Sequence, residues 1–109
     1  MTSQYLVRSG QITMHSYAIV EATAPIQSRL GMQPLRLMHE RIVPTLETRW
    51  IDPETHGAAV TALLAADARR VSFVDRVSFE VMRRDGIEAA FAFDKDFGSQ
   101  GFRTIPAQG

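Results

Sequence analysis

Two acidic side chains of this chain stand where a metal-binding crevice commonly forms. Asp75 is the third residue of a predicted helix that begins after Ser72. Gly86 predicts the end of that helix, and the mostly apolar residues 87–93 predict a short buried strand that Asp94 closes. Because ligands bind at the carboxyl edge of open α/β sheets, the two acids predict an acidic crevice at that edge.

Glu21 is the third candidate ligand. It is the only charged residue between Arg8 and Arg29, and its neighbours are mostly apolar. A carboxylate buried among such residues needs a partner, a proton or a cation. Pro25, four residues further on, would disturb the hydrogen bond to the Glu21 carbonyl, and the resulting kink would change the direction of this turn of the helix. The alternative is that Glu21 points to solvent through a gap in the apolar stripe.

Each of the other acids also has a purely structural explanation. Asp75 can complete a capping box with Ser72. Asp94 and Asp96 can be turn residues whose side chains bond nearby backbone N–H groups. The combination favours a site, because acids at a helix start, a strand end and a mid-helix face converge only around one crevice. Converging carboxylates repel one another, and Mg²⁺ or Mn²⁺, which prefer oxygen ligands, would relieve that repulsion.

Residues 72–97 and the closing GFRTIP segment resemble the carboxyl-terminal part of PIN-domain proteins, a ribonuclease family that includes the VapC-type toxins. The segment HSYAIVEATAPIQSRLG resembles the family's glutamate-bearing helix, with Glu21 in the place of that glutamate. The resemblance implies an α/β fold of three layers, in which helices flank a short parallel sheet. Since it extends over nearly the whole chain, we expect residues 1–109 to form a single PIN-like domain.

One part of the family's pattern is missing, namely a first strand that ends in an aspartate followed by serine or threonine. The twenty residues before Glu21 contain no acid. We therefore expect a domain that is truncated at its amino terminus and whose activity in this form is weak or absent. Since the family's first strand lies in the middle of the sheet, its loss would leave two unpaired edges. We expect a homo-oligomer that covers them.

The resemblance also implies a reaction and the residues that carry it. The implied metal ligands are Glu21, Asp75, Asp94 and Asp96, and the first three are the implied catalytic residues. A bound Mg²⁺ or Mn²⁺ ion would activate the water that hydrolyses an RNA phosphodiester bond. Arg76 and Lys95, which adjoin the acids, are candidate RNA contacts. The implied partners are the RNA substrate and an antitoxin protein.

The sequence also allows two other functions to be considered. A non-catalytic remnant of the family would keep the fold, bind another protein or itself, and bind Mg²⁺ no better than an exposed carboxylate pair. A phosphoacceptor signalling domain shares the α/β architecture and the acidic crevice. Such domains place paired acids directly after their first strand and a lysine after their last, and this sequence has neither arrangement.

Composition limits the class of protein. Twelve basic and twelve acidic residues give a formal net charge of zero, so the chain lacks the basic excess of dedicated nucleic-acid binders. No apolar run approaches the roughly 20 residues that span a bilayer, and no secretory signal is visible. We therefore expect a cytoplasmic protein that does not enter membranes. The absence of cysteine excludes disulfides and thiolate zinc sites.

The remaining pattern predicts alternating strands and helices. Strands are predicted over residues 11–14, 46–51, 87–93 and 102–105, and helices begin near residues 16, 34, 53 and 73. Residues 4–8 are interpreted as the tail of a helix, and Trp50 as a core residue. The three histidines fit no metal-ligand spacing and are interpreted as caps or surface residues; they are His15, His39 and His56.

Overall fold

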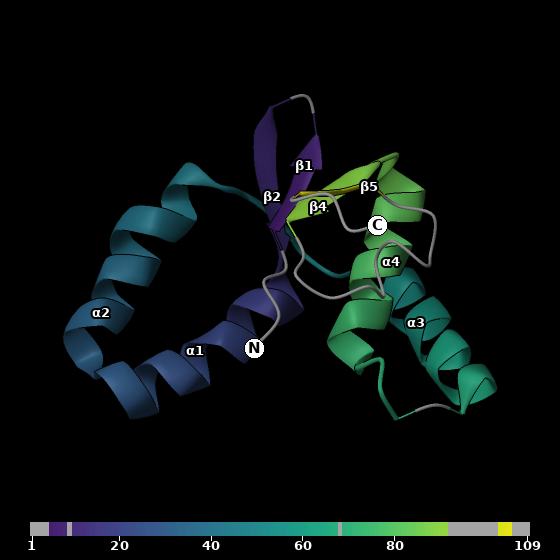
Figure 1. Cartoon of the computed structure of the whole chain (residues 1–109), viewed down its shortest axis with the longest axis horizontal. Coiled ribbons are helices and arrows are strands. Elements are labelled where there is room, and N and C mark those ends of the chain that lie inside the picture. Colours follow the sequence, from purple (N-terminus) through teal and green to yellow (C-terminus); the bar gives the residue numbers. More distant parts are fainter. Residues whose placement is uncertain (1–4, 9, 68, 92–102, 106–109) are drawn as a thin grey trace.

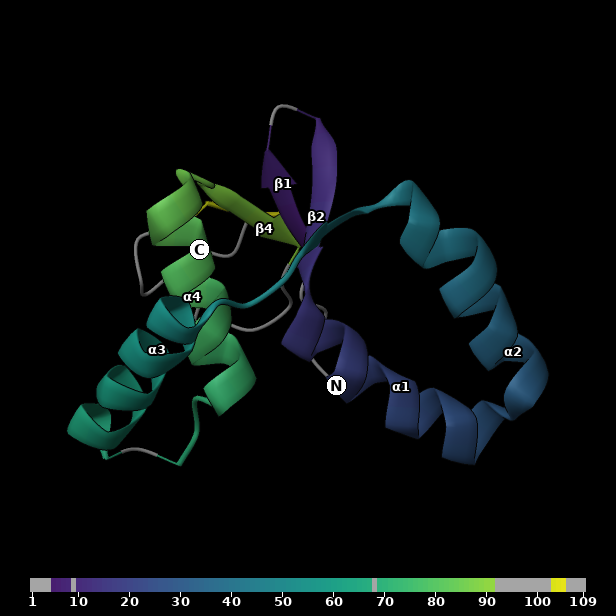
Figure 2. The same cartoon turned by 180° about the vertical axis from the view of Figure 1, so that it is seen from behind.

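The computed structural model describes residues 5–8, 10–67, 69–91 and 103–105. The strands are β1 (Tyr5–Arg8), β2 (Gln11–His15), β3 (Glu47–Arg49), β4 (Ala89–Phe91) and β5 (Arg103–Ile105). The helices are α1 (Ser16–Leu30), α2 (Met32–Leu37), the π-helical turn η1 (Met38–Ile42), the 3-10 turn η2 (Val43–Thr45), α3 (Pro53–Ala66) and α4 (Phe73–Asp85). Within these described residues, no helix has the length and apolarity needed to cross a membrane. Figures 1 and 2 show α1 and α2 to one side of the strands, with α3 and α4 on the other.

The five described strands form one mixed sheet in the order β3-β2-β1-β4-β5. β2 pairs with β3 in parallel, and β4 pairs with β5 in parallel. β1 runs antiparallel to both β2 and β4. It leads into β2 through a tight turn in which Gly10 has a φ of 78°, a backbone conformation that suits glycine. The predicted α/β fold is confirmed, but its sheet is mixed where a parallel one was expected.

The amino-terminal strand corrects two predictions. Residues 5–8 are not the tail of a helix, because they form β1. This strand occupies the middle of the sheet, where Leu6 is paired with Thr13 on β2 and with Ala90 on β4. The expectation of two unpaired edges at that place is therefore wrong. A segment rich in β-formers, followed at once by a tight turn, can fold back and pair with both neighbouring strands.

β1 also contributes to the hydrophobic clusters on both faces of the sheet. Leu6 is fully buried in the cluster formed with α3 and α4. Tyr5 is partly buried against the other cluster, which joins β2 to α1 and η1. This division is expected because successive side chains of a strand point to opposite faces. The sheet is thus covered on both faces, which gives the three layers that the resemblance implies.

Local capping explains where two of the helices begin and where one ends. The Asp52 carboxylate accepts a hydrogen bond from the Thr55 N–H at 2.7 Å and starts α3. The Ser72 hydroxyl accepts one from the Asp75 N–H at 3.1 Å and starts α4. Gly86 ends α4 in the left-handed conformation, with a φ of 68°. These three boundaries agree with the sequence-based predictions.

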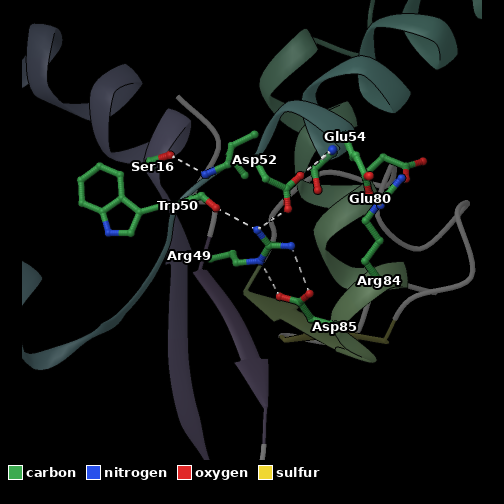
Figure 3. Close-up of polar contacts among 10 residues, drawn as sticks. Ser16, Arg49, Trp50, Asp52, Glu54, Glu80, Arg84 and Asp85 are labelled. Carbon is green, nitrogen blue, oxygen red and sulfur yellow. Dashed lines mark hydrogen bonds and ion pairs between the residues drawn. The ribbon is translucent and has the colours of Figure 1, made fainter.

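An ion pair joins the carboxyl end of β3 to the carboxyl end of α4 (Figure 3). Arg49 Nε donates to Asp85 Oδ2 at 2.8 Å, and Arg49 Nη2 donates to Asp85 Oδ1 at 3.3 Å. Such two-pronged contacts are stronger and more specific in geometry than single ones.

The prediction that Trp50 is a core residue is wrong, since 75% of its surface is exposed. Figure 3 shows the reason: Arg49 turns toward Asp85, and the ring of the next residue points away from that ion pair.

Candidate functional site

Asp75 lies in the first turn of α4 and is buried, with only 6% of its surface exposed. Its backbone N–H donates to the Ser72 hydroxyl, so Ser72 caps this helix as expected. A residue that serves only a helix start can do so at the surface, because capping needs no burial. Burial of a carboxylate is costly, and this one is therefore the strongest candidate for a functional acid.

Glu21 lies on α1, which runs unbroken from Ser16 to Leu30 with Pro25 inside it. The residue is exposed at the molecular surface, as the solvent-facing alternative requires. Its carboxylate is nevertheless partly desolvated, and this desolvation, together with the negative charge of Asp75, raises the pKa of Glu21. The structure therefore brings Glu21 and Asp75 close enough for their charges to repel, although 54 positions separate them in the sequence.

The remaining predicted ligands, Asp94 and Asp96, lie outside the described residues, as does the candidate RNA contact Lys95. Within the described ranges, no three acidic or histidine side chains gather as a metal-binding group. β1 adds no acid to the site. Because β1 is antiparallel, Tyr5 is the residue of this strand that pairs with Phe91 at the carboxyl end of β4.

The two carboxylates whose charges influence each other are of the type that suits a hard divalent cation. Mg²⁺ is commonly held in proteins by one or two carboxylates, with water and substrate phosphates completing its shell. One carboxylate here is buried on a capped helix, and the other lies at the surface of the neighbouring helix. A cation between them would also remove the repulsion that raises the pKa of Glu21. The donor set thus fits Mg²⁺ or Mn²⁺.

His15 contacts both helices that carry the two acids, a connection that the sequence did not reveal. It ends β2 and caps α1, because its Nδ1 accepts a hydrogen bond from the Ala18 N–H at 3.2 Å. With Nδ1 accepting, the ring proton of the neutral imidazole lies on Nε2, which is 2.7 Å from the Ser78 hydroxyl on α4. The sequence interpretation left His15 as either a cap or a surface residue; the structure shows it as the cap of α1 and as fully buried.

Burial lowers the pKa of His15 from 6.5 to about 4, an effect that its hydrogen bond to the Val74 backbone opposes and the charge of Arg49 reinforces. The folded protein therefore holds this ring neutral at a pH where the unfolded chain protonates it. Between pH 6.5 and about 4 the unfolded state binds the extra proton, so stability falls as the pH is lowered through this window.

We expect His15→Asn, which cannot take up a proton, to lose less stability than the wild type over this window. Thermal unfolding at pH 7 and at pH 4.5 measures the difference for each protein. His56→Asn is the control, since it removes a histidine that is exposed. An equal loss of stability on acidification in wild type and His15→Asn would contradict the assignment.

Arg76 follows Asp75 on α4 and is partly buried. Its Nε is buried and has no hydrogen-bond partner within the described part of the chain. This nitrogen thus retains hydrogen-bonding capacity, which is what a phosphate contact requires. Its role as an RNA contact stays a prediction.

A pocket of about 270 Å³ lies against a different face of α1 from the one that carries Glu21. Its lining is mostly apolar and comes from α1, η1, η2 and the region of β3. The lining residues are Ser16, Ile19, Val20, His39, Val43, Thr48 and Trp50. The exposed ring of Trp50 therefore forms part of a concave apolar surface that is separate from the acidic pair.

No protein-family model matches this chain. Over 40 residues, which are 37% of this chain, it is 55% identical to the 23S rRNA-specific endonuclease VapC20 of Mycobacterium tuberculosis, in strain CDC 1551 / Oshkosh and in strain ATCC 25618 / H37Rv. This match covers 30% of the length of those curated relatives.

The likeness in three dimensions extends further. The crystal structure of Mycobacterium tuberculosis VapC20, described as a Sarcin-Ricin loop cleaving toxin, matches this chain with a TM-score of 0.76 and 28% sequence identity. The match covers 87% of this chain and 74% of that one. The fold is therefore shared over most of this chain, whereas high sequence identity is confined to a 40-residue segment.

Proposed function

We propose that this chain, which resembles VapC20-like PIN-domain toxin ribonucleases in part of its sequence and in its fold, is a metal-dependent endoribonuclease of that type. The predicted resemblance to the family is confirmed by both comparisons. The observation that carries the proposal is that the charge of the buried Asp75 acts on Glu21, an acid of the neighbouring helix, in a fold of this kind.

When bound, Mg²⁺ or Mn²⁺ would polarise the phosphodiester and lower the pKa of the attacking water. Asp75 would be the fixed ligand, because α4 is capped at Ser72 and its first turn is buried. Glu21 would be the second ligand, placed at the surface where substrate and water have access. The other proposed ligands and RNA contacts are Asp94, Asp96, Arg76 and Lys95.

The proposed substrate class is RNA. VapC20 is named for its action on 23S rRNA and on the Sarcin-Ricin loop, and the fold of this chain is similar. We further propose an antitoxin protein as partner and a low level of activity for this form. The low activity follows from the lack of any acid among the first twenty residues, since fewer anionic ligands hold the cation less tightly.

Incubation of the purified chain with a ribosomal RNA fragment and Mn²⁺ tests this proposal. We expect slow cleavage that EDTA abolishes and Mn²⁺ restores. Cleavage as fast as that by VapC20 under the same conditions would contradict the predicted weakness. Absence of both cleavage and Mn²⁺ binding would remove the nuclease proposal itself.

A non-catalytic module that binds another protein or itself is the second candidate. Large apolar side chains are exposed along α1, α2, η1 and the end of β3, and they are Val20, Leu30, Met32, Leu37, Ile42 and Trp50. The homo-oligomer was first expected because two strand edges would be unpaired, but β1 pairs with both of those strands. The proposal of a homo-oligomer now depends on these exposed side chains and on the apolar pocket. Titration with Mg²⁺ separates the candidates, because the module should bind no better than an exposed carboxylate pair.

A further inference from the structure

We propose that His15 is a positioning residue for the candidate site: it ties α1, which carries Glu21, to α4, which carries Asp75, and so sets how far apart the two carboxylates lie. The inference rests on the proposed function, in which these acids share a divalent ion. It assigns to the histidine a role beyond that of a helix cap.

The hydrogen bonds of His15 reach both helices about one turn from the acids. On α1 the imidazole accepts from the Ala18 N–H at 3.2 Å, and Ala18 precedes Glu21 by three residues. On α4 it lies 2.7 Å from the hydroxyl of Ser78, which follows Asp75 by three residues. Residues three apart lie on the same side of a helix, so the bridge and the acids lie along neighbouring faces.

The bridge is held firmly because it is buried. His15 and Ser78 are both fully buried, with exposed fractions of 0%. Breaking their hydrogen bond without water to replace it would remove a buried polar contact from both side chains, which is costly. A separation of the two helices at this point is therefore opposed by the bond and by the packing around it.

The backbone of His15 is anchored to the sheet as well. His15 is the last residue of β2 and pairs in parallel register with Arg49 of β3. The next residue, Ser16, accepts a hydrogen bond from the Ile51 N–H at 3.1 Å (Figure 3). The start of α1 is thus fixed to the β3 side of the sheet, and the imidazole links this fixed point to α4 through Ser78.

The chain offers a matched control for this bridge. The Tyr17 hydroxyl lies 2.7 Å from His56 Nδ1, so a second bond between a histidine and a hydroxyl starts from α1. It leads to α3 instead of α4, and His56 is exposed. Its removal should leave the spacing of the two acids unchanged.

Two substitutions separate the bridge from the cap. His15→Asn keeps a good N-cap side chain for the Ala18 N–H but is too short to reach α4. Ser78→Ala leaves the imidazole in place and removes only the hydroxyl on α4. If the hydrogen bond between His15 and Ser78 sets the spacing, the double variant should lose no more Mn²⁺ affinity than either single variant. His56→Asn is the control, and thermal unfolding verifies that each variant is folded at the temperature used.

The first measurement is the distance between α1 and α4. Because the chain has no cysteine, spin labels can be attached through Gln27→Cys and Arg83→Cys, two exposed positions on these helices. Double electron–electron resonance at pH 7.5 should give a narrow distance distribution for the otherwise unchanged chain and for His56→Asn. We expect a broadened or shifted distribution for His15→Asn, for Ser78→Ala and for the double variant.

The second measurement is the affinity for Mn²⁺ alone, from the loss of the free-ion signal in electron paramagnetic resonance. We expect the dissociation constant to rise about tenfold in the three bridge variants, the effect typical of removing a partner that orients a metal ligand. His56→Asn should bind as the wild type does.

Each outcome decides the inference. An unchanged distance distribution in both His15→Asn and Ser78→Ala would overturn it, and so would a broadened distribution with unchanged affinity. If the wild type binds no Mn²⁺, the proposed function fails, and the distance measurement still decides whether His15 sets the spacing of the helices. If His15→Asn does not fold, Ser78→Ala, which retains the cap, carries the test.

Discussion

Asp75→Asn is expected to abolish Mn²⁺ binding and metal-dependent RNA cleavage while the chain remains folded. The amide is nearly the same size as the carboxylate and leaves the bond between the Asp75 backbone N–H and Ser72 in place. It removes the anionic oxygen that a hard cation requires. Loss of a direct ligand should exceed the roughly 10- to 100-fold cost of removing a residue that merely orients one.

Asp75→Asn should also change the pKa of Glu21, although it leaves the Glu21 side chain itself unaltered. The charge of Asp75 is the second cause of the raised Glu21 pKa, after desolvation, so Asp75→Asn should lower that pKa part of the way toward its ordinary value. A pH titration of the Glu21 carboxyl carbon by NMR measures this shift in the absence of any metal. It reports on the closeness of the two carboxylates even if no activity is found.

Asp67→Asn is the matched control for Asp75→Asn. Asp67 is exposed at the end of α3 and has a left-handed backbone with a φ of 48°, which asparagine also tolerates. The same chemical change there should leave metal binding and the pKa of Glu21 as they are. Cleavage that survives Asp75→Asn at the wild-type rate would show that the activity does not arise from this acidic pair.

Leu6→Ala should lower the free energy of unfolding by about 3 kcal/mol, within the range measured for removal of large apolar side chains from cores. Leu6 is fully buried in the cluster shared with α3 and α4, on a strand that is paired on both sides. The substitution leaves a cavity that the paired backbone cannot readily close. For a chain of this length, we expect the melting temperature to fall by more than about 10 °C.

Leu64→Ala provides the comparison, because Leu64 lies on α3 with 72% of its surface exposed. A surface substitution of this kind should change stability by less than about 0.5 kcal/mol. Urea unfolding of both variants gives the two values directly. If Leu6→Ala proved as mild as Leu64→Ala, residues 5–8 would not occupy the centre of the sheet, and the expectation of unpaired edges would return.

The sequence by itself determined the features that depend on near neighbours. Ser72 before Asp75 and Gly86 after α4 were sufficient to predict helix boundaries that the structure confirms, and the helix start predicted near residue 53 is confirmed as well. The family resemblance could likewise be read from continuous segments, and the comparisons bear it out. Caps and turns involve residues no more than about four positions apart, so their signals are complete within a short stretch of chain.

Only the tertiary structure decided which distant parts meet. Four residues of β1 are too few to show a period, and their partners on β4 lie more than 80 positions away, so the sequence interpretation as a helix tail was wrong. The contact of His15 with Ser78 spans 63 positions, and the closeness of Glu21 to Asp75 depends on how α1 packs beside α4. Such pairs are selected by burial and by the sheet register, which depend on the whole chain, so no local pattern of residues encodes them.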